Sequence, residues 1–220
     1  MNDLEFKNSR PVNEGLESAL AALFFETGKG KEVSLISIAG IGASGKSILA
    51  ANIAQKLGED VAILETDDYL IPKAERRKLG ITIGNPASIK LDRLKGDIER
   101  IKRKESIIQP VYYGNIGERM FIPKKYVILE GTWALAEEFQ DLLDIRIFIE
   151  CEPETQKARR FSRDTVIKGQ TREEILALLH PRQLEFDHYI APNKRYADIV
   201  LRSHPDFSME ILEDRLGLNI

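Results

Sequence analysis

The sequence is poor in the residues that build disulfides, metal centres and membrane segments. Its 220 residues include one cysteine and three histidines, and no long apolar run occurs. One cysteine excludes an intrachain disulfide, and the N-terminus lacks the charged segment followed by an apolar one that is typical of a secretion signal. We therefore expect a cytoplasmic protein with no membrane partner. Cys151 ends an apolar segment, which favours a structural thiol over a nucleophile.

An excess of positive charge is also missing. The chain has 32 Lys and Arg residues against 35 Asp and Glu residues, a formal net charge of −3. This balance argues against nucleic acid as a charge-driven partner. Hydrophobic residues make up 43% of the chain, and 220 residues are enough for one α/β domain with a single large core.

What the chain does contain is a regular alternation of short apolar segments and helical patterns. We expect strands at 33–39, 61–65, 126–131, 145–149 and 197–201, and helices at 12–25, 48–57, 89–104 and 154–163. Such an alternation predicts a parallel sheet with helices on both faces. We expect an N-terminal helical extension over residues 1–30 and a single domain over residues 31–220.

The first strand is followed by a phosphate-binding loop of the P-loop (Walker A) type, G-x-x-x-x-G-K-S. Its eight residues are Gly40, Ile41, Gly42, Ala43, Ser44, Gly45, Lys46 and Ser47. The glycines allow the backbone N–H groups to face the phosphates of ATP, while Lys46 reaches the β- and γ-phosphate oxygens and Ser47 ligates Mg²⁺. Because a strand precedes the loop and a helix follows it, a chance match is disfavoured.

Carboxylates follow two other predicted strands. Asp67 comes at the end of the second strand and can accept the proton of an attacking hydroxyl while helping to hold Mg²⁺. From the residues alone Asp68 could do the same, and both could instead cap a helix or lie in a solvated turn. Glu130 ends the third strand, where a carboxylate reaches Mg²⁺ directly or through water, or is simply an edge residue.

A basic segment over about residues 159–172 follows the fourth strand. It contains Arg159, Arg160 and Arg163. Guanidinium groups on a segment that closes over ATP can stabilise the charge of the transferring phosphoryl group and exclude water, which predicts a lid. The alternative is a solvated basic face of a surface helix.

Together these motifs resemble the uridine kinase and phosphoribulokinase family over roughly residues 33–202. The resemblance is carried by segments 40–47, 67–69, 110–112, 127–131, 159–164 and 194–198. It implies a P-loop NTPase fold with a five-stranded parallel sheet in the order 2-3-1-4-5, and transfer of the γ-phosphoryl group of ATP to an alcohol with Mg²⁺ as cofactor.

The resemblance also implies roles for individual residues. Asp67 resembles the catalytic base, acting with Lys46, and Ser47 and Glu130 complete the Mg²⁺ site with it. Arg163 resembles the lid arginine on the transferring phosphoryl group. Within an acceptor-side insertion over about residues 70–122, and around it, we assign five residues to acceptor binding: Asp68, Tyr69, Tyr112, Arg119 and Arg160.

Three departures concern the acceptor. Where uridine kinases have a histidine that contacts the base, this chain has Gly117. Where they have a His-Pro pair, it has Asn85-Pro86, and where they have a second lid arginine, it has Gln170. A uridine- or cytidine-like nucleoside is the leading acceptor, and a sugar, sugar phosphate or polyol is the alternative. A nucleotide-hydrolysing switch is the alternative of another class, although the guanine-binding Asn-Lys-x-Asp motif is absent. The sequence leaves open whether the phosphoryl donor is ATP or GTP, and whether the chain forms a homo-oligomer.

Overall fold

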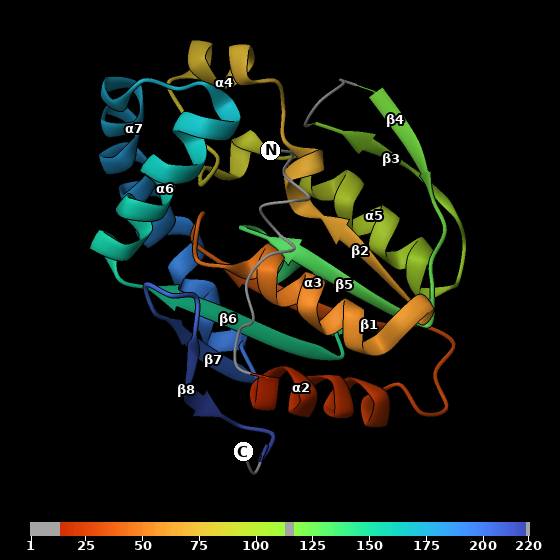
Figure 1. The fold of residues 1–220 in the computed structure, drawn as a ribbon. Coiled ribbons are helices and arrows are strands. Elements are labelled where there is room, and N and C mark those ends of the chain that lie inside the picture. Colours follow the sequence, from red (N-terminus) through yellow and green to blue (C-terminus); the bar gives the residue numbers. More distant parts are fainter. Residues whose placement is uncertain (1–13, 113–116, 219–220) are drawn as a thin grey trace.

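The computed structural model describes residues 14–112 and 117–218, so residues 1–13 of the predicted extension lie outside it. Its centre is a six-stranded sheet in the order β2-β5-β1-β6-β7-β8 (Figure 1). The strands of this sheet are β1 (Ser34–Gly40), β2 (Val61–Glu65), β5 (Tyr126–Gly131), β6 (Ile145–Cys151), β7 (Ile199–Ser203) and β8 (Met209–Asp214).

The five parallel strands confirm the predicted order 2-3-1-4-5 when they are numbered among themselves. The prediction of five strands is wrong, because β8 joins the edge of the sheet antiparallel to β7. The central strands β1 and β5 are buried along their whole length, as strands covered on both faces must be.

Helices cover both faces of the sheet, as the alternation predicted. The larger helices are α2 (Glu14–Thr27), α3 (Lys46–Leu57), α4 (Lys73–Leu79), α5 (Leu91–Lys102), α6 (Pro153–Lys168) and α7 (Arg172–Glu185). One face packs against α2 and α3, with Leu20, Phe24 and Ile53 fully buried. The other packs against α5, with Leu94 and Ile98 fully buried.

The remaining elements are short. Short helical segments are η1 (Gly58–Asp60), η2 (Thr66–Tyr69), η3 (Pro86–Ser88), η4 (Glu137–Leu142), η5 (Phe186–Ile190) and η6 (Ala191–Tyr196). A separate hairpin is made by β3 (Ile107–Val111) and β4 (Gly117–Phe121). Three helices, α4, α6 and α7, lie together beyond the carboxyl ends of the parallel strands (Figure 1). Among the described residues, no helix is both long enough and apolar enough to cross a membrane.

Candidate active site

The loop between β1 and α3 has the backbone of a phosphate cradle. Gly45 precedes α3 at φ +99°, and Ala43 lies at φ +72°, a left-handed conformation that an L-residue rarely adopts. A Cβ at Gly42 would lie 2.5 Å from Nη2 of Arg160, so a larger residue there would displace that guanidinium. The loop thus turns sharply at the N-terminus of α3, where backbone N–H groups and the helix dipole favour an anion.

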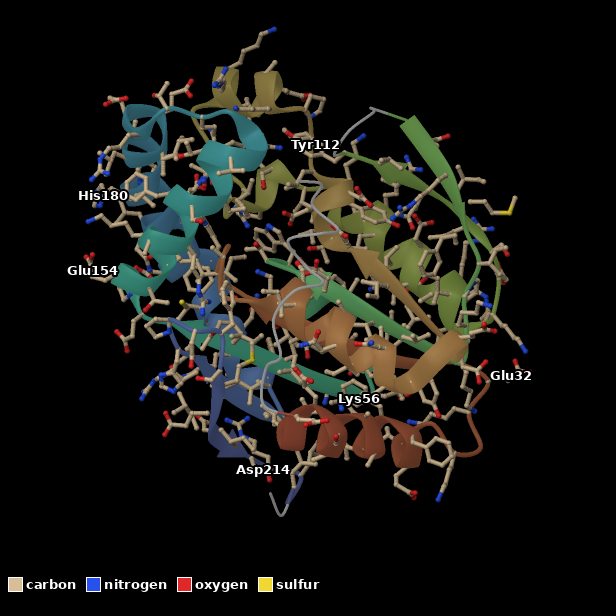
Figure 2. The ribbon with its side chains drawn as sticks, viewed as in Figure 1. Glu32, Lys56, Tyr112, Glu154, His180 and Asp214 are labelled. Carbon is tan, nitrogen blue, oxygen red and sulfur yellow. The ribbon has the colours of Figure 1, made fainter. Side chains whose placement is uncertain are left out.

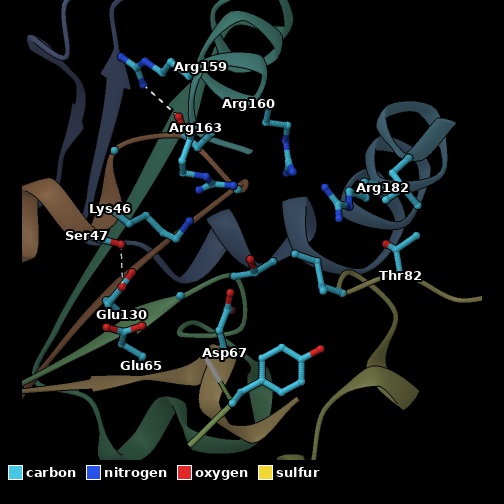
Figure 3. Close-up of a pocket in the computed structure, with 18 of the residues that line it drawn as sticks. Lys46, Ser47, Glu65, Asp67, Thr82, Glu130, Arg159, Arg160, Arg163 and Arg182 are labelled. Carbon is cyan, nitrogen blue, oxygen red and sulfur yellow. Dashed lines mark hydrogen bonds between the residues drawn. The ribbon is translucent and has the colours of Figure 1, made fainter. Parts of the chain in front are cut away.

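Lys46 extends from this loop into a cavity of about 410 Å³ (Figure 3). Its Nζ donates to the carbonyl oxygen of Ile41, 3.0 Å away, and the side chain is buried. Burial lowers the pKa of Lys46, the carboxylates of Glu130 and Asp67 oppose that shift, and the neighbouring Arg163 and Arg160 add to it. A bound phosphate, being negatively charged, would therefore stabilise the charged form of the Lys46 ammonium group.

Three carboxylates and a hydroxyl meet at the carboxyl edge of the sheet. Glu130, near the end of β5, lies beside Glu65 of β2, and Ser47 Oγ donates to Glu130 Oε1 at 2.8 Å. Asp67, in η2 directly after β2, lines the same cavity. Figure 3 shows Lys46, Glu130 and Asp67 facing the same space.

These oxygens fit a magnesium ion. Mg²⁺ is bound by one or two carboxylates together with water and substrate phosphates rather than by a full protein cage. Ser47, Glu130 and Asp67 supply oxygen ligands of that kind next to the phosphate loop. The described residues hold no cluster of three or more His, Cys, Asp or Glu side chains of the sort that binds a metal without such help.

The three arginines of α6 have different surroundings. Arg159 donates to the carbonyl oxygen of Ala43 and to Ser203 Oγ, both at 3.1 Å, and its guanidinium lies 3.7 Å from the ring centre of Phe207. This side chain joins the phosphate loop to the segment between β7 and β8. It therefore has a structural role that the sequence did not indicate.

Arg160 and Arg163 both lie beside the fully buried Asp164. Nε of Arg163 donates to Asp164 Oδ1 at 2.8 Å, and Nη1 of Arg160 is 4.0 Å from Oδ2. Both arginines line the cavity, and Arg160 lies against Gly42 of the phosphate loop. The buried carboxylate thus holds two guanidinium groups near the expected position of the ATP phosphates, although the closing of this segment as a lid stays a prediction.

Three residues that we assigned to the acceptor do not line the cavity in the described structure. The hydroxyl of Tyr69, a fully buried residue, donates to Asp97 Oδ2 at 2.9 Å. Asp68 is also buried and accepts hydrogen bonds from Gln109 Nε2, from the backbone N–H of Tyr112, and from Arg119 Nη2 at 3.3 Å. These contacts fasten η2 to the β3–β4 hairpin, which is a structural task, and the assignment of these residues to the acceptor stays a prediction.

Tyr112 does line the cavity, and an unforeseen arginine holds it. It directly follows β3 (Figure 2). Arg76 of α4 donates to the tyrosine hydroxyl at 2.9 Å and to the carbonyl oxygen of Ile71 at 2.5 Å. The guanidinium carbon is 5.2 Å from the ring centre, which adds a cation–π contact.

Several cavity residues were missed from the sequence. They are Glu65, Lys73, Arg76, Arg77, Thr82, Thr132, Arg182 and Phe207. The run Lys73 to Lys78 is visibly basic, but nothing local says that it faces a site. Cys151 is half-buried and burial raises the pKa of its thiol, which fits a thiol with no chemical role.

Comparison with known proteins identifies relatives of this architecture. The model of the phosphoribulokinase / uridine kinase family matches residues 35–210. The chain is 30% identical to the phosphoribulokinase of Synechocystis sp. over 84% of its own length, and spans 58% of the length of that relative. It is 28% identical to the uridine kinase of Chlamydia pneumoniae, over 84% of this chain and 88% of that protein.

A solved structure has the same fold. The phosphoribulokinase from Rhodobacter spheroides superposes with a TM-score of 0.66 at 17% identity, and the match covers 86% of this chain and 83% of that one. At this level of identity the likeness concerns the fold alone.

Proposed function

This chain belongs to the phosphoribulokinase and uridine kinase family, and on that basis we propose that it transfers the γ-phosphoryl group of ATP to a hydroxyl group of a small metabolite. The observation that carries the proposal is the convergence of Lys46, Ser47, Asp67 and Glu130 on one cavity, which Arg160 and Arg163 also line. Phosphoryl transfer needs little more than such positioning and charge stabilisation.

Each residue has a task in this proposal. The loop N–H groups and Lys46 hold the phosphates, and Asp67 accepts the proton of the attacking hydroxyl. Arg163 and Arg160 stabilise the negative charge that spreads over the transferring oxygens. Ser47, Glu130 and Asp67 would hold Mg²⁺, which when bound neutralises phosphate charge. Membership of this family favours ATP as the phosphoryl donor. That the chain forms a homo-oligomer stays a prediction.

The identity of the acceptor is a separate question. The relatives named uridine kinase favour a nucleoside, as the sequence did. However, Gly117 lies at the start of β4 with no side chain to contact a base. A switch that only hydrolyses nucleotide has no specific support, because the cavity extends well beyond the phosphate loop to α4 and α7.

The test is ADP release with MgATP against a panel of nucleosides, sugars, sugar phosphates, hydroxy acids and polyols. We expect turnover that depends on one class of alcohol and that Lys46→Ala removes. Hydrolysis of ATP at the same rate with and without every alcohol would contradict the proposal and favour the switch.

A further inference from the structure

One face of α6 is turned toward the phosphate loop and the cavity. Its polar residues, at the helical spacing i, i+3, i+4 and i+7, are Gln156, Arg159, Arg160 and Arg163. Figure 3 shows Arg160 and Arg163 reaching into the cavity, whereas Arg159 turns in another direction. Gln156 and Arg159 are buried, so their polar groups have to bond inside the protein.

Both of these side chains donate to backbone carbonyl oxygens of the phosphate loop. Nε2 of Gln156 donates to the carbonyl oxygen of Gly42, and Nη1 of Arg159 donates to that of Ala43, each at 3.1 Å. In a trans peptide the C=O and N–H groups point in opposite directions. The two bonds therefore turn the N–H groups of Ala43 and Ser44 away from α6, at the place where Ala43 has φ +72°.

Arg159 is itself held firmly on its other side. It donates to Ser203 Oγ at 3.1 Å, and its guanidinium lies 3.7 Å from the ring centre of Phe207. The same segment between β7 and β8 packs against the loop, because a Cβ at Gly45 would lie 3.2 Å from Cε of Met209. The guanidinium is therefore fixed between two parts of the chain and cannot follow the loop if a loop peptide turns over.

The direction of these peptide groups decides whether the loop can bind phosphate. A loop of this type binds anions through N–H groups that face the ligand, and a peptide turned over would present a carbonyl oxygen instead. The loop resists such a turn only weakly by itself, because Gly42 and Gly45 have more conformational freedom than other residues. Bonds from outside the loop are needed to hold one orientation.

We propose that Gln156 and Arg159 are positioning residues of the phosphate site. They hold two successive loop carbonyl oxygens toward α6, away from the ATP phosphates, and they set the distance between the loop and the two arginines on the same helix face. This inference rests on the proposed kinase function and deepens it. In this proposal neither residue touches the reacting atoms, and both act through the loop backbone.

The experiment measures binding of two probes, MgATP and magnesium tripolyphosphate, by calorimetric titration. Gln156→Leu removes one neutral donor and should weaken both probes about 2- to 10-fold, and Arg159→Met removes a charged donor and should weaken both about 10- to 100-fold. The matched control is Lys157→Met, which removes a cation from the same helix. Lys157 has a side chain that is 39% exposed and does not line the cavity, so binding should stay within about twofold of the wild type.

Tripolyphosphate separates an action through the loop from a contact with the base of ATP. If Arg159→Met weakened ATP but left tripolyphosphate unchanged, the inference would be overturned. Arg159→Lys separates geometry from charge, because lysine keeps the charge and loses the planar fork of donors. It should recover part of the lost affinity, and full recovery would refute the positioning role of Arg159. Gln156→Leu changes no charge, so its loss of affinity would not reflect a lost attraction for phosphate.

Steady-state kinetics and urea unfolding give the second readout. Both variants should raise KM for ATP and lower kcat while KM for the acceptor stays unchanged, because the loop moves relative to Arg160 and Arg163. A merely structural role would lower the free energy of unfolding and leave these constants of the folded protein at their wild-type values. That result would contradict the inference.

Binding of the probes also distinguishes this inference from the proposed function. If no alcohol is phosphorylated, but the wild type binds both probes and Gln156→Leu and Arg159→Met weaken them equally, the inference stands and the kinase function is refuted. If the wild type turns over an alcohol and the variants bind both probes as it does, the inference alone is refuted. A wild type that binds neither probe would refute both.

Discussion

Replacing Asp67 by asparagine tests the proposed chemistry, because a neighbouring carboxylate provides the control. Asp67 and Asp68 are consecutive in η2, yet Asp67 lines the cavity while Asp68 is buried behind it. Asparagine has nearly the shape of aspartate but cannot take a proton. The same substitution at the two positions therefore changes chemistry at one and packing at the other.

At position 67 the expected loss is kinetic. General base catalysis contributes about 10²- to 10⁴-fold, so Asp67→Asn should raise the activation barrier by about 3 to 5 kcal/mol and reduce kcat accordingly. Binding of MgATP should change much less, because the phosphate loop and Lys46 provide its main contacts.

At position 68 the expected loss is one of stability. The carboxylate of Asp68 accepts from Gln109 Nε2 at 2.9 Å and from the backbone N–H of Tyr112 at 3.0 Å. In Asp68→Asn the amide nitrogen must face one of these donors, which costs about 1 to 3 kcal/mol of unfolding free energy. We expect kcat within about tenfold of the wild type and a higher KM for the acceptor, because Tyr112 lines the cavity.

The assay combines steady-state ADP release, calorimetric titration with MgATP and urea unfolding for both variants. The reasoning fails if Asp67→Asn keeps kcat within tenfold of the wild type. It also fails if Asp68→Asn, still folded, loses more turnover than Asp67→Asn does.

Three further variants test the phosphate site and the stability of the sheet. Lys46→Ala should lower kcat/KM about 10²- to 10³-fold, and unaltered kinetics would refute the assignment of the phosphate site. Because burial lowers the pKa of Lys46, the ammonium group of the free protein loses its proton at a pH below its ordinary pKa of 10.5. The affinity of the wild type for MgATP should therefore already weaken as the pH rises toward 10.5. Glu130→Gln should raise the Mg²⁺ concentration for half-maximal turnover about 10- to 100-fold, measured by titrating Mg²⁺ at fixed ATP, and no shift would exclude Glu130 from the metal site. Burial alone would raise the pKa of Asp144, but hydrogen bonds from Lys102, Lys31 and a backbone N–H lower it. The stabilisation is therefore present above the ordinary pKa of 3.8 and lost below it, so Asp144→Asn should cost about 1 to 2 kcal/mol near pH 7 in urea unfolding and progressively less as the pH falls below about 3.8.

The parts of the fold that the sequence predicts correctly are those with a strong local pattern. Strands β1 and β5 are apolar along nearly their whole length because both of their faces are buried, and the phosphate loop is a contiguous motif between a strand and a helix. Strand β8 has neither advantage. Its sequence from Met209 to Asp214 mixes apolar and acidic residues without strict alternation, and it is a strand because its backbone pairs with β7. A short, half-polar edge strand has too little local signal to be separated from a loop.

The choice between Asp67 and Asp68 shows a second limit. Both residues follow the apolar strand β2, and either spacing is compatible with a catalytic carboxylate. The direction of each side chain depends on the helical turn η2, and on the donors from the β3–β4 hairpin that draw Asp68 away from the cavity. Those donors lie about forty residues further along the chain, so no local pattern contains the answer.

The two ends of the cavity differ in how their residues are held, and this difference explains why the acceptor was the hardest part to predict. Glu130 and Glu65 are placed by the register of β5 with β2, and Ser47 is bonded to Glu130 at the start of α3. Arg182 and Thr82 are placed by contacts between α7 and a loop about a hundred residues earlier, outside the sheet. Substitutions on α4 or α7 can therefore change the charge at that end of the cavity without moving the phosphate loop or the proposed magnesium ligands. Relatives with this sheet can share ATP chemistry and differ in acceptor, so the acceptor of this protein has to be inferred from the cavity residues of its own α4 and α7.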